Sequence, residues 1–279
     1  MTSPLVSARD LAALLAHGPG PVTVLDIRYQ TGLADGRAAY ESGHLPGAVY
    51  VDVDDDLAAP PAGPGEPGGR HPLPATADFE TAMRRAGVRG DRPVVVYDDW
   101  GSRAAARAWW LLRYHGHADV RVLDGGWSAW LAAGGAREEG LVTPEPGDFT
   151  VDPGHLPVVE PEDVLAVEVL VDARAPERYA GEHEPIDPVA GHVPGAVNVP
   201  TAENLGTDGR FKSPDDLRRT YAAVGAVPGA DVAAYCGSGV TACHNLLALA
   251  VARVPAALYA GSWSDWVSDP ERPVAGQPA

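Results

Sequence analysis

The segment Tyr235–Ala242, which reads Tyr-Cys-Gly-Ser-Gly-Val-Thr-Ala, holds the residue best suited to covalent chemistry. Cys236 follows an apolar, strand-like run over 232–235, and a helix-like apolar run extends from about 241 to 251. Gly237 and Gly239 let the intervening backbone curl inward without Cβ clashes. Backbone N–H groups and a helix N-terminus both stabilise an anion, so they favour a thiolate over a thiol. A merely packed cysteine needs no glycine-lined turn, so the pattern predicts a nucleophile.

Alternating strands and helices must position this loop. Short, β-rich apolar runs predict strands at 22–28, 48–52, 93–98, 120–125, 168–174, 196–200, 231–236 and 256–261. Helical patterns fall near 7–16, 76–86, 102–115, 213–223 and 241–252. This alternation predicts the α/β class, with parallel sheets flanked by helices.

Four landmarks recur in the same order in both halves of the 279-residue chain. Each half contains an Asp-x-Arg motif after an early strand, a His-x-Pro-Gly-Ala-Val motif, a strand ending in tyrosine, and a Gly-x-Trp motif with a second tryptophan. They are Asp26–Arg28 and Asp172–Arg174, His44–Val49 and His192–Val197, Val95–Asp98 and Ala233–Cys236, and Gly125–Trp130 and Gly261–Trp266. The chain is therefore a duplication.

The duplication predicts two domains joined by a linker. We place the first domain at 1–137, a linker rich in proline, glycine and acidic residues at 138–157, and the second domain at 158–279. Aligning the two halves puts Asp98 at the position of Cys236. A carboxylate cannot replace a sulfur nucleophile, so the first domain is predicted to be catalytically silent.

Composition restricts the partners and the cellular compartment expected for the protein. The net charge of −17 argues against nucleic acid as a partner, because phosphate binding needs a basic face. It also requires local cations at any site for an anionic substrate. Two cysteines, no long apolar run and no signal-peptide pattern at Met1–Leu5 predict a cytoplasmic protein without a membrane partner.

Taken together, these landmarks resemble the tandem rhodanese-domain sulfurtransferases over nearly the whole chain. The resemblance implies two rhodanese-like domains and a ping-pong reaction, in which Cys236 takes a sulfur atom from a donor as a persulfide and passes it to a thiophilic acceptor. The expected partners are a small anionic sulfur donor and, as acceptor, cyanide, a small thiol or a thioredoxin-like protein. Backbone N–H groups stabilise thiolate and persulfide, so no metal and no organic cofactor is expected.

The loop favours one donor within this family. Members similar to thiosulfate sulfurtransferases carry basic residues after the cysteine, whereas Gly237 and Ser238 are uncharged, as in 3-mercaptopyruvate sulfurtransferases. By the same resemblance, Ser238 contacts the substrate carbonyl or delivers a proton, together with Asp54 and His71. Arg178 matches the arginine that binds the anionic end of the substrate, but a second family arginine is replaced by Asp187. Thiosulfate therefore stays open as the alternative donor.

The predicted site thus has catalytic and substrate-binding members. The catalytic residues are Cys236, Ser238, Asp54 and His71, and the substrate-binding residues are Arg178, Gly237, Gly239, Val240 and Thr241. A cysteine-dependent phosphatase would need an arginine at the position of Ala242, so that class is rejected. A binding module without catalysis does not explain the glycine-lined cysteine, while a sulfur-relay protein would need the same persulfide.

Other reactive side chains are expected to be structural. Cys243 is predicted to be a packed, inert thiol, because a helix separates it from Cys236 by about 10 Å. His44 and His192 recur in both halves and are expected to bond backbone at a turn. The Asp-x-Arg motifs are expected to form internal ion pairs.

Overall fold

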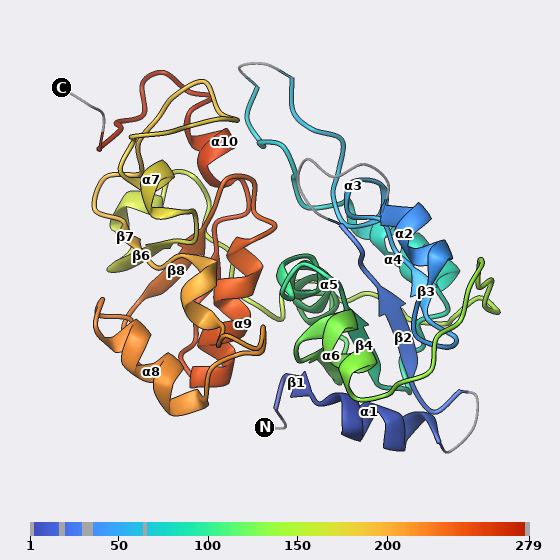
Figure 1. Ribbon diagram of the computed structural model, residues 1–279. Coiled ribbons are helices and arrows are strands. Elements are labelled where there is room, and N and C mark those ends of the chain that lie inside the picture. Colours follow the sequence, from blue (N-terminus) through green and yellow to red (C-terminus); the bar gives the residue numbers. More distant parts are fainter. Residues whose placement is uncertain (1–2, 17–19, 30–35, 64–65, 277–279) are drawn as a thin grey trace. The chain divides into compact units, whose positions relative to one another are not determined.

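The computed structural model describes residues 3–16, 20–29, 36–63 and 66–276, and within it the chain forms two compact units. The first unit comprises 1–57, 74–156 and 207–210, and the second comprises 58–73, 157–206 and 211–279. Each unit contains a parallel sheet with its own helices (Figure 1). The predicted α/β class is confirmed. Helices long and apolar enough to cross a lipid bilayer do not occur in the described ranges.

The sheet of the first unit has five parallel strands in the order β1-β5-β4-β2-β3. Its strands are β1 (Leu5–Val6), β2 (Thr23–Asp26), β3 (Val49–Tyr50), β4 (Val94–Tyr97) and β5 (Val120–Leu123). Its helices are α1 (Ala8–Leu15), α2 (Gly36–Ser42), α3 (Val53–Asp56), α4 (Thr76–Arg85), α5 (Arg103–Tyr114) and α6 (Gly126–Ala132). All four residues of the central strand β4 are buried, as expected for a parallel sheet covered on both faces.

The sheet of the second unit has four parallel strands in the order β7-β6-β8-β9. Its strands are β6 (Val169–Asp172), β7 (Val197–Asn198), β8 (Val232–Tyr235) and β9 (Ala257–Leu258). Its helices are η1 (Val164–Ala166), α7 (Pro176–Tyr179), η2 (Thr201–Asn204), α8 (Pro214–Ala222), α9 (Ala242–Ala252) and α10 (Ser262–Trp266). Every predicted strand is present in a shorter form, and β1 is an additional strand that the sequence pattern did not indicate.

The duplication extends to individual hydrogen bonds. The Tyr97 hydroxyl accepts the Leu45 N–H at 3.1 Å, and the Tyr235 hydroxyl accepts the Val193 N–H at 3.2 Å. His44 and His192 each bring Nδ1 to the carbonyl of a stacked tyrosine, at 2.9 and 2.7 Å. The expected backbone-bonding role of both histidines is confirmed.

Each Asp-x-Arg motif also forms the expected internal ion pair. Arg28 contacts Asp26 at 2.9 Å, and Arg174 contacts Asp172 at 2.6 Å. Each arginine also lies over the tryptophan of its own unit, Trp127 or Trp263. These pairs are shared by both halves and belong to the scaffold of each unit.

The proline-rich tract 58–73 lies in the second unit, although it connects two elements of the first. It runs beside α10 (Figure 1), where the Gly68 N–H donates to Asp265 Oδ1 at 2.6 Å and the Arg70 N–H donates to Ser264 Oγ at 3.1 Å. The tract has no apolar periodicity, so its position follows from these polar contacts. His71 is consequently placed with Cys236 in one compact unit.

Candidate active site

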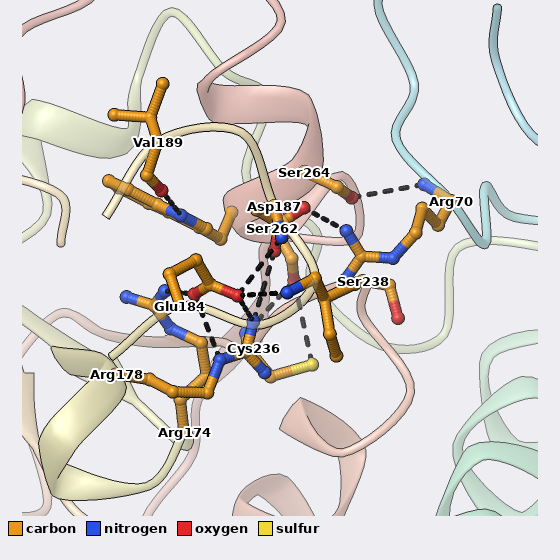
Figure 2. A network of polar contacts seen from close by, with 12 residues as sticks. Arg70, Arg174, Arg178, Glu184, Asp187, Val189, Cys236, Ser238, Ser262 and Ser264 are labelled. Atoms are coloured by element: carbon orange, nitrogen blue, oxygen red, sulfur yellow. Dashed lines mark hydrogen bonds and ion pairs between the residues drawn. The ribbon is translucent and has the colours of Figure 1, made fainter. Parts of the chain in front are cut away.

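Cys236 follows directly after β8, as the sequence predicts, and its side chain is buried. The Gly239 N–H donates to Cys236 Sγ at 3.1 Å. The Cys236 N–H donates to Ser262 Oγ at 3.1 Å, and Figure 2 shows these two residues side by side. Gly239 has a φ of +81°, and a Cβ there would lie 2.3 Å from the Ala260 carbonyl oxygen. A glycine is therefore needed to turn this N–H toward the sulfur.

Helix α10 fixes the direction of the loop peptides. The Trp263 N–H donates to the Cys236 carbonyl at 2.9 Å, and the Ser264 N–H donates to the Gly237 carbonyl at 3.0 Å. In a trans peptide the N–H points opposite to the C=O. Because these carbonyls face α10, the N–H groups of Gly237 and Ser238 point away from it. The loop thus presents donors on the side opposite α10, as a cradle for negative charge requires.

Ser238 and His71 meet beside the cysteine loop. His71 Nδ1 lies 2.7 Å from Ser238 Oγ, which joins the tract 58–73 to the loop after β8. The predicted association of these two residues is present in the structure. A hydroxyl bonded to an imidazole is suited to proton transfer, because the imidazole can accept or return the proton.

Arg178 lies on α7, with its guanidinium directed at the loop. Its Nε and Nη2 donate to Glu184 at 3.0 and 2.7 Å, and its Nη2 also donates to Asp187 Oδ2 at 3.1 Å (Figure 2). Although burial acts to raise it, the hydrogen bond from Arg178 and two backbone N–H groups hold the pKa of Glu184 below its ordinary value. Glu184 is therefore a charged anchor that orients Arg178.

The remaining predicted site residues lie in three places. Val240 is buried, and its carbonyl accepts the Cys243 N–H at 3.2 Å. Thr241 precedes α9, and its carbonyl accepts the His244 N–H at 3.1 Å. Asp54 lies on α3 of the first unit, where its N–H donates to Asp52 Oδ1 at 2.8 Å. The role of Asp54 in the site stays a prediction.

A family model described as a rhodanese-like domain matches residues 7–133 and 160–269. The chain belongs to the rhodanese family. It is 46% identical over 277 residues to the putative thiosulfate sulfurtransferase SseB of Mycobacterium tuberculosis, covering 97% of this chain and 96% of that protein. It is also 46% identical over 282 residues to the probable 3-mercaptopyruvate sulfurtransferase of Pseudomonas aeruginosa, covering 97% of each.

A solved structure agrees with these relatives. The crystal structure of SseA from Escherichia coli, described as a 3-mercaptopyruvate sulfotransferase with the rhodanese fold, matches with a TM-score of 0.79 and 34% identity. The match covers 94% of this chain and 100% of that one. The family and fold expected from the sequence landmarks are confirmed.

The first rhodanese-like domain has a cradle of its own, and Asp98 fills it. The Asp98 carboxylate accepts N–H bonds from Trp100, Ser102, Ala104 and Ala105 at 2.8 to 2.9 Å. The Trp127 N–H donates to the Asp98 carbonyl, as the Trp263 N–H does to that of Cys236. Burial raises the pKa of Asp98, and the four N–H bonds act in the opposite direction.

The other reactive side chains of the second rhodanese-like domain are packed. Cys243 is buried on α9, and its Sγ donates to the Gly239 carbonyl at 3.4 Å. His244 is buried as well, with Nδ1 3.2 Å from Asn204 Nδ2 and its ring stacked on Phe211. The Cys243 side chain thus connects α9 to the cysteine loop, and the His244 side chain connects α9 to Asn204 and Phe211.

Two residues next to the cysteine loop escaped the sequence analysis. Ser262 accepts the Cys236 N–H and has a φ of +57°, which is unfavourable for serine. The repeat alignment offered a signal, because the matching residue of the first domain is Gly126, also at +57°. Arg70 is the other, and its guanidinium forms an ion pair with Asp187. It lies in the aperiodic tract 58–73, where no pattern singled it out.

Proposed function

We propose that this protein is a sulfurtransferase that moves a sulfur atom from 3-mercaptopyruvate to a thiophilic acceptor through a persulfide on Cys236. Support comes from the Gly239 N–H that donates to the sulfur, from the family, and from relatives named as thiosulfate or 3-mercaptopyruvate sulfurtransferases. The observation that selects 3-mercaptopyruvate is the 2.7 Å contact between His71 and Ser238 beside the nucleophile.

The chemistry of the leaving group explains this choice. The Cys236 thiolate attacks the donor sulfur, an S–S bond forms and the C–S bond breaks. The C–S electron pair becomes the enolate of pyruvate, which must take up a proton to give pyruvate. A hydroxyl bonded to an imidazole can stabilise that enolate and supply the proton. Thiosulfate would instead release sulfite, which is a stable anion and needs no proton.

The second half-reaction restores the enzyme. Cyanide or a thiolate attacks the outer sulfur of the persulfide, the S–S bond breaks, and the Cys236 thiolate leaves. With cyanide the products are thiocyanate and the resting enzyme. We propose a small thiol or a thioredoxin-like protein as the other acceptors, since each supplies the same thiolate nucleophile.

The proposal is tested with kcat/KM for 3-mercaptopyruvate and thiosulfate, each with cyanide as acceptor. Mass spectrometry after donor alone should show one added sulfur atom, located on Cys236. We expect 3-mercaptopyruvate to be the better donor, C236S to be inactive, and the matched variant C243S to stay active. A preference for thiosulfate would overturn the assignment of 3-mercaptopyruvate as the donor. Sulfur transfer by C236S would overturn the persulfide mechanism. Persulfide formation with transfer only to a protein thiol would indicate a relay function.

A further inference from the structure

Two guanidinium groups converge on the residue that follows the nucleophile. A Cβ placed on Gly237 would lie 3.0 Å from Arg70 Nη2 and 3.5 Å from Arg178 Nη1. Arg70 comes from the tract 58–73 and Arg178 from α7, so distant segments of the chain supply the two groups. Their side chains are 32% and 16% exposed, so both are partly accessible to solvent. Figure 2 shows both arginines together with Cys236 and Ser238.

Asp187 joins the two arginines from behind. Its Oδ1 pairs with Arg70 Nη1 and its Oδ2 accepts from Arg178 Nη2, while its side chain is only 2% exposed. Burial raises the pKa of Asp187 above its ordinary value, against the opposing charges of Arg70 and Arg178. One buried carboxylate thus bridges two cations that would otherwise repel each other.

The backbone of Arg70 is held by the same helix that holds the cysteine loop. Its N–H donates to Ser264 Oγ at 3.1 Å, and the N–H of Ser264 itself donates to the Gly237 carbonyl at 3.0 Å. Gly69, just before Arg70, has a φ of +75°, and a Cβ there would lie 2.6 Å from the Gly261 carbonyl. Only glycine permits this close approach to α10, and it fixes where the Arg70 side chain begins.

We propose that Arg70 and Arg178 together bind the anionic end of the sulfur donor, with Asp187 as the positioning residue that holds both. This inference rests on the proposed function, because it assigns the donor-binding part of that site. A guanidinium binds a carboxylate through paired N–H donors, and two converging guanidinium groups offer more donors than one. Glu184 and Asp187 pair with other nitrogens of these guanidinium groups. The groups offered to an anionic donor are therefore Arg70 Nη2 and Arg178 Nη1, the nitrogens nearest Gly237. In a chain with a net charge of −17, an anionic donor requires such local N–H donors.

The position of the pair also explains why the loop itself carries no charge. Gly237 leaves open the space that both guanidinium groups face, and a side chain there would displace Arg70 Nη2. The guanidinium groups of Arg70 and Arg178 therefore approach the sulfur donor from outside the cysteine loop, while the backbone N–H groups of the loop stabilise the sulfur of Cys236. Anion binding and sulfur chemistry are divided between two sets of residues.

The test compares R70A with wild type on a charged and a neutral donor. Charge-assisted hydrogen bonds contribute enough that KM for 3-mercaptopyruvate should rise about ten- to hundredfold, with kcat within about threefold. KM for the methyl ester of 3-mercaptopyruvate and KM for cyanide should not change. R70K should give an intermediate KM, because lysine keeps the charge without the planar fork. R219A, which removes an exposed arginine paired with Asp216 on α8, is the matched control.

A binding measurement separates this inference from the proposed function. Calorimetric titration of the C236S variant with pyruvate should give a Kd that rises about tenfold or more when R70A is added. Weaker pyruvate binding in an enzyme that fails to transfer sulfur would support the anion site and overturn only the function. Unchanged KM and pyruvate Kd in an active enzyme would overturn the anion site.

The positioning role of Asp187 is tested by coupling. If Asp187 aligns Arg70, R70A should raise KM by a smaller factor in the D187N background than in wild type. A structural role of Asp187 alone would lower the thermal midpoint without changing that factor. Equal factors in both backgrounds would remove Asp187 from the site.

Discussion

Replacing Ser238 with alanine separates the two candidate donors more sharply than any other single change. The variant deletes the hydroxyl that lies 2.7 Å from His71 Nδ1. It leaves the backbone of the loop intact, including the Gly239 N–H that donates to Cys236 Sγ at 3.1 Å. The thiolate and the N–H groups around it should persist. We therefore expect the change to slow protonation of the leaving group and not the attack of Cys236 on the donor sulfur.

The size of the effect follows from the role of the hydroxyl. A positioned acid or base contributes roughly 10²- to 10⁴-fold to a rate. Ser238 itself is only partly buried, so water can partly replace the lost proton donor. We therefore expect the lower end, a loss of about 10²-fold with 3-mercaptopyruvate, equivalent to about 3 kcal/mol. Sulfite leaves without a proton, so the rate with thiosulfate should change by less than about threefold.

Single-turnover formation of the Cys236 persulfide measures this step without the acceptor reaction. Rapid quenching followed by mass spectrometry gives the rate for each donor in wild type and S238A. The control is S128A, which removes an exposed hydroxyl bonded to Asp99 in the first unit. An equal loss with both donors, or no loss with 3-mercaptopyruvate, would refute the assignment of Ser238 and His71 to the proton step.

Two further predictions concern the loop and the scaffold. G239A should lower kcat by at least tenfold and reduce the free energy of unfolding by about 1–3 kcal/mol, because φ is +81° and the new Cβ would lie 2.3 Å from the Ala260 carbonyl. The control G209A has a φ of +75° with no atom within 4 Å, so equal losses in both variants would exclude crowding as the cause. Burial raises the pKa of Asp26 from 3.8 to about 6, so the folded state holds this proton more tightly. Stability from this group is complete below the unfolded pKa and is lost as pH rises toward 6. Wild type should therefore lose up to about 3 kcal/mol relative to D26N between pH 4 and 7 in denaturant titrations, and a constant difference would contradict the shift.

The sequence predicted the parts of the fold that local patterns encode. Apolar runs such as Val94–Tyr97 and Val232–Tyr235 are buried on both faces of a parallel sheet, so strand signals and strand positions coincide. The cysteine loop was predictable for the same reason, since it follows directly after such a strand. Short elements such as β1 (Leu5–Val6) and α10 (Ser262–Trp266) carry too few residues for a period to appear, and tertiary contacts decide them.

The second arginine of the site could not be predicted, for a physical reason. The resemblance to the family showed that Asp187 stands where a second arginine is expected. In the structure, Asp187 pairs with Arg70 from the distant tract 58–73. That tract is held by individual bonds, such as Gly68 N–H to Asp265 and Arg70 N–H to Ser264, which leave no periodic signal. Only the folded chain shows which distant residues share these contacts.

The loops that follow Asp98 and Cys236 have matching positions in the two domains but hold different side chains. In the first domain, four N–H groups bind the Asp98 carboxylate, so the chain itself supplies the anion and the loop is closed by its own side chain. In the second domain the same position holds Cys236, whose sulfur receives the Gly239 N–H and can carry negative charge as thiolate or persulfide. A carboxylate oxygen stays bonded to its carbon, whereas a thiolate sulfur can accept another sulfur atom and release it again. The bond from a tryptophan N–H to the carbonyl of the strand-end residue recurs in both halves, from Trp127 to Asp98 and from Trp263 to Cys236. We therefore expect the side chain at the strand end, aspartate or cysteine, to decide whether the cradle stabilises the fold or performs the chemistry.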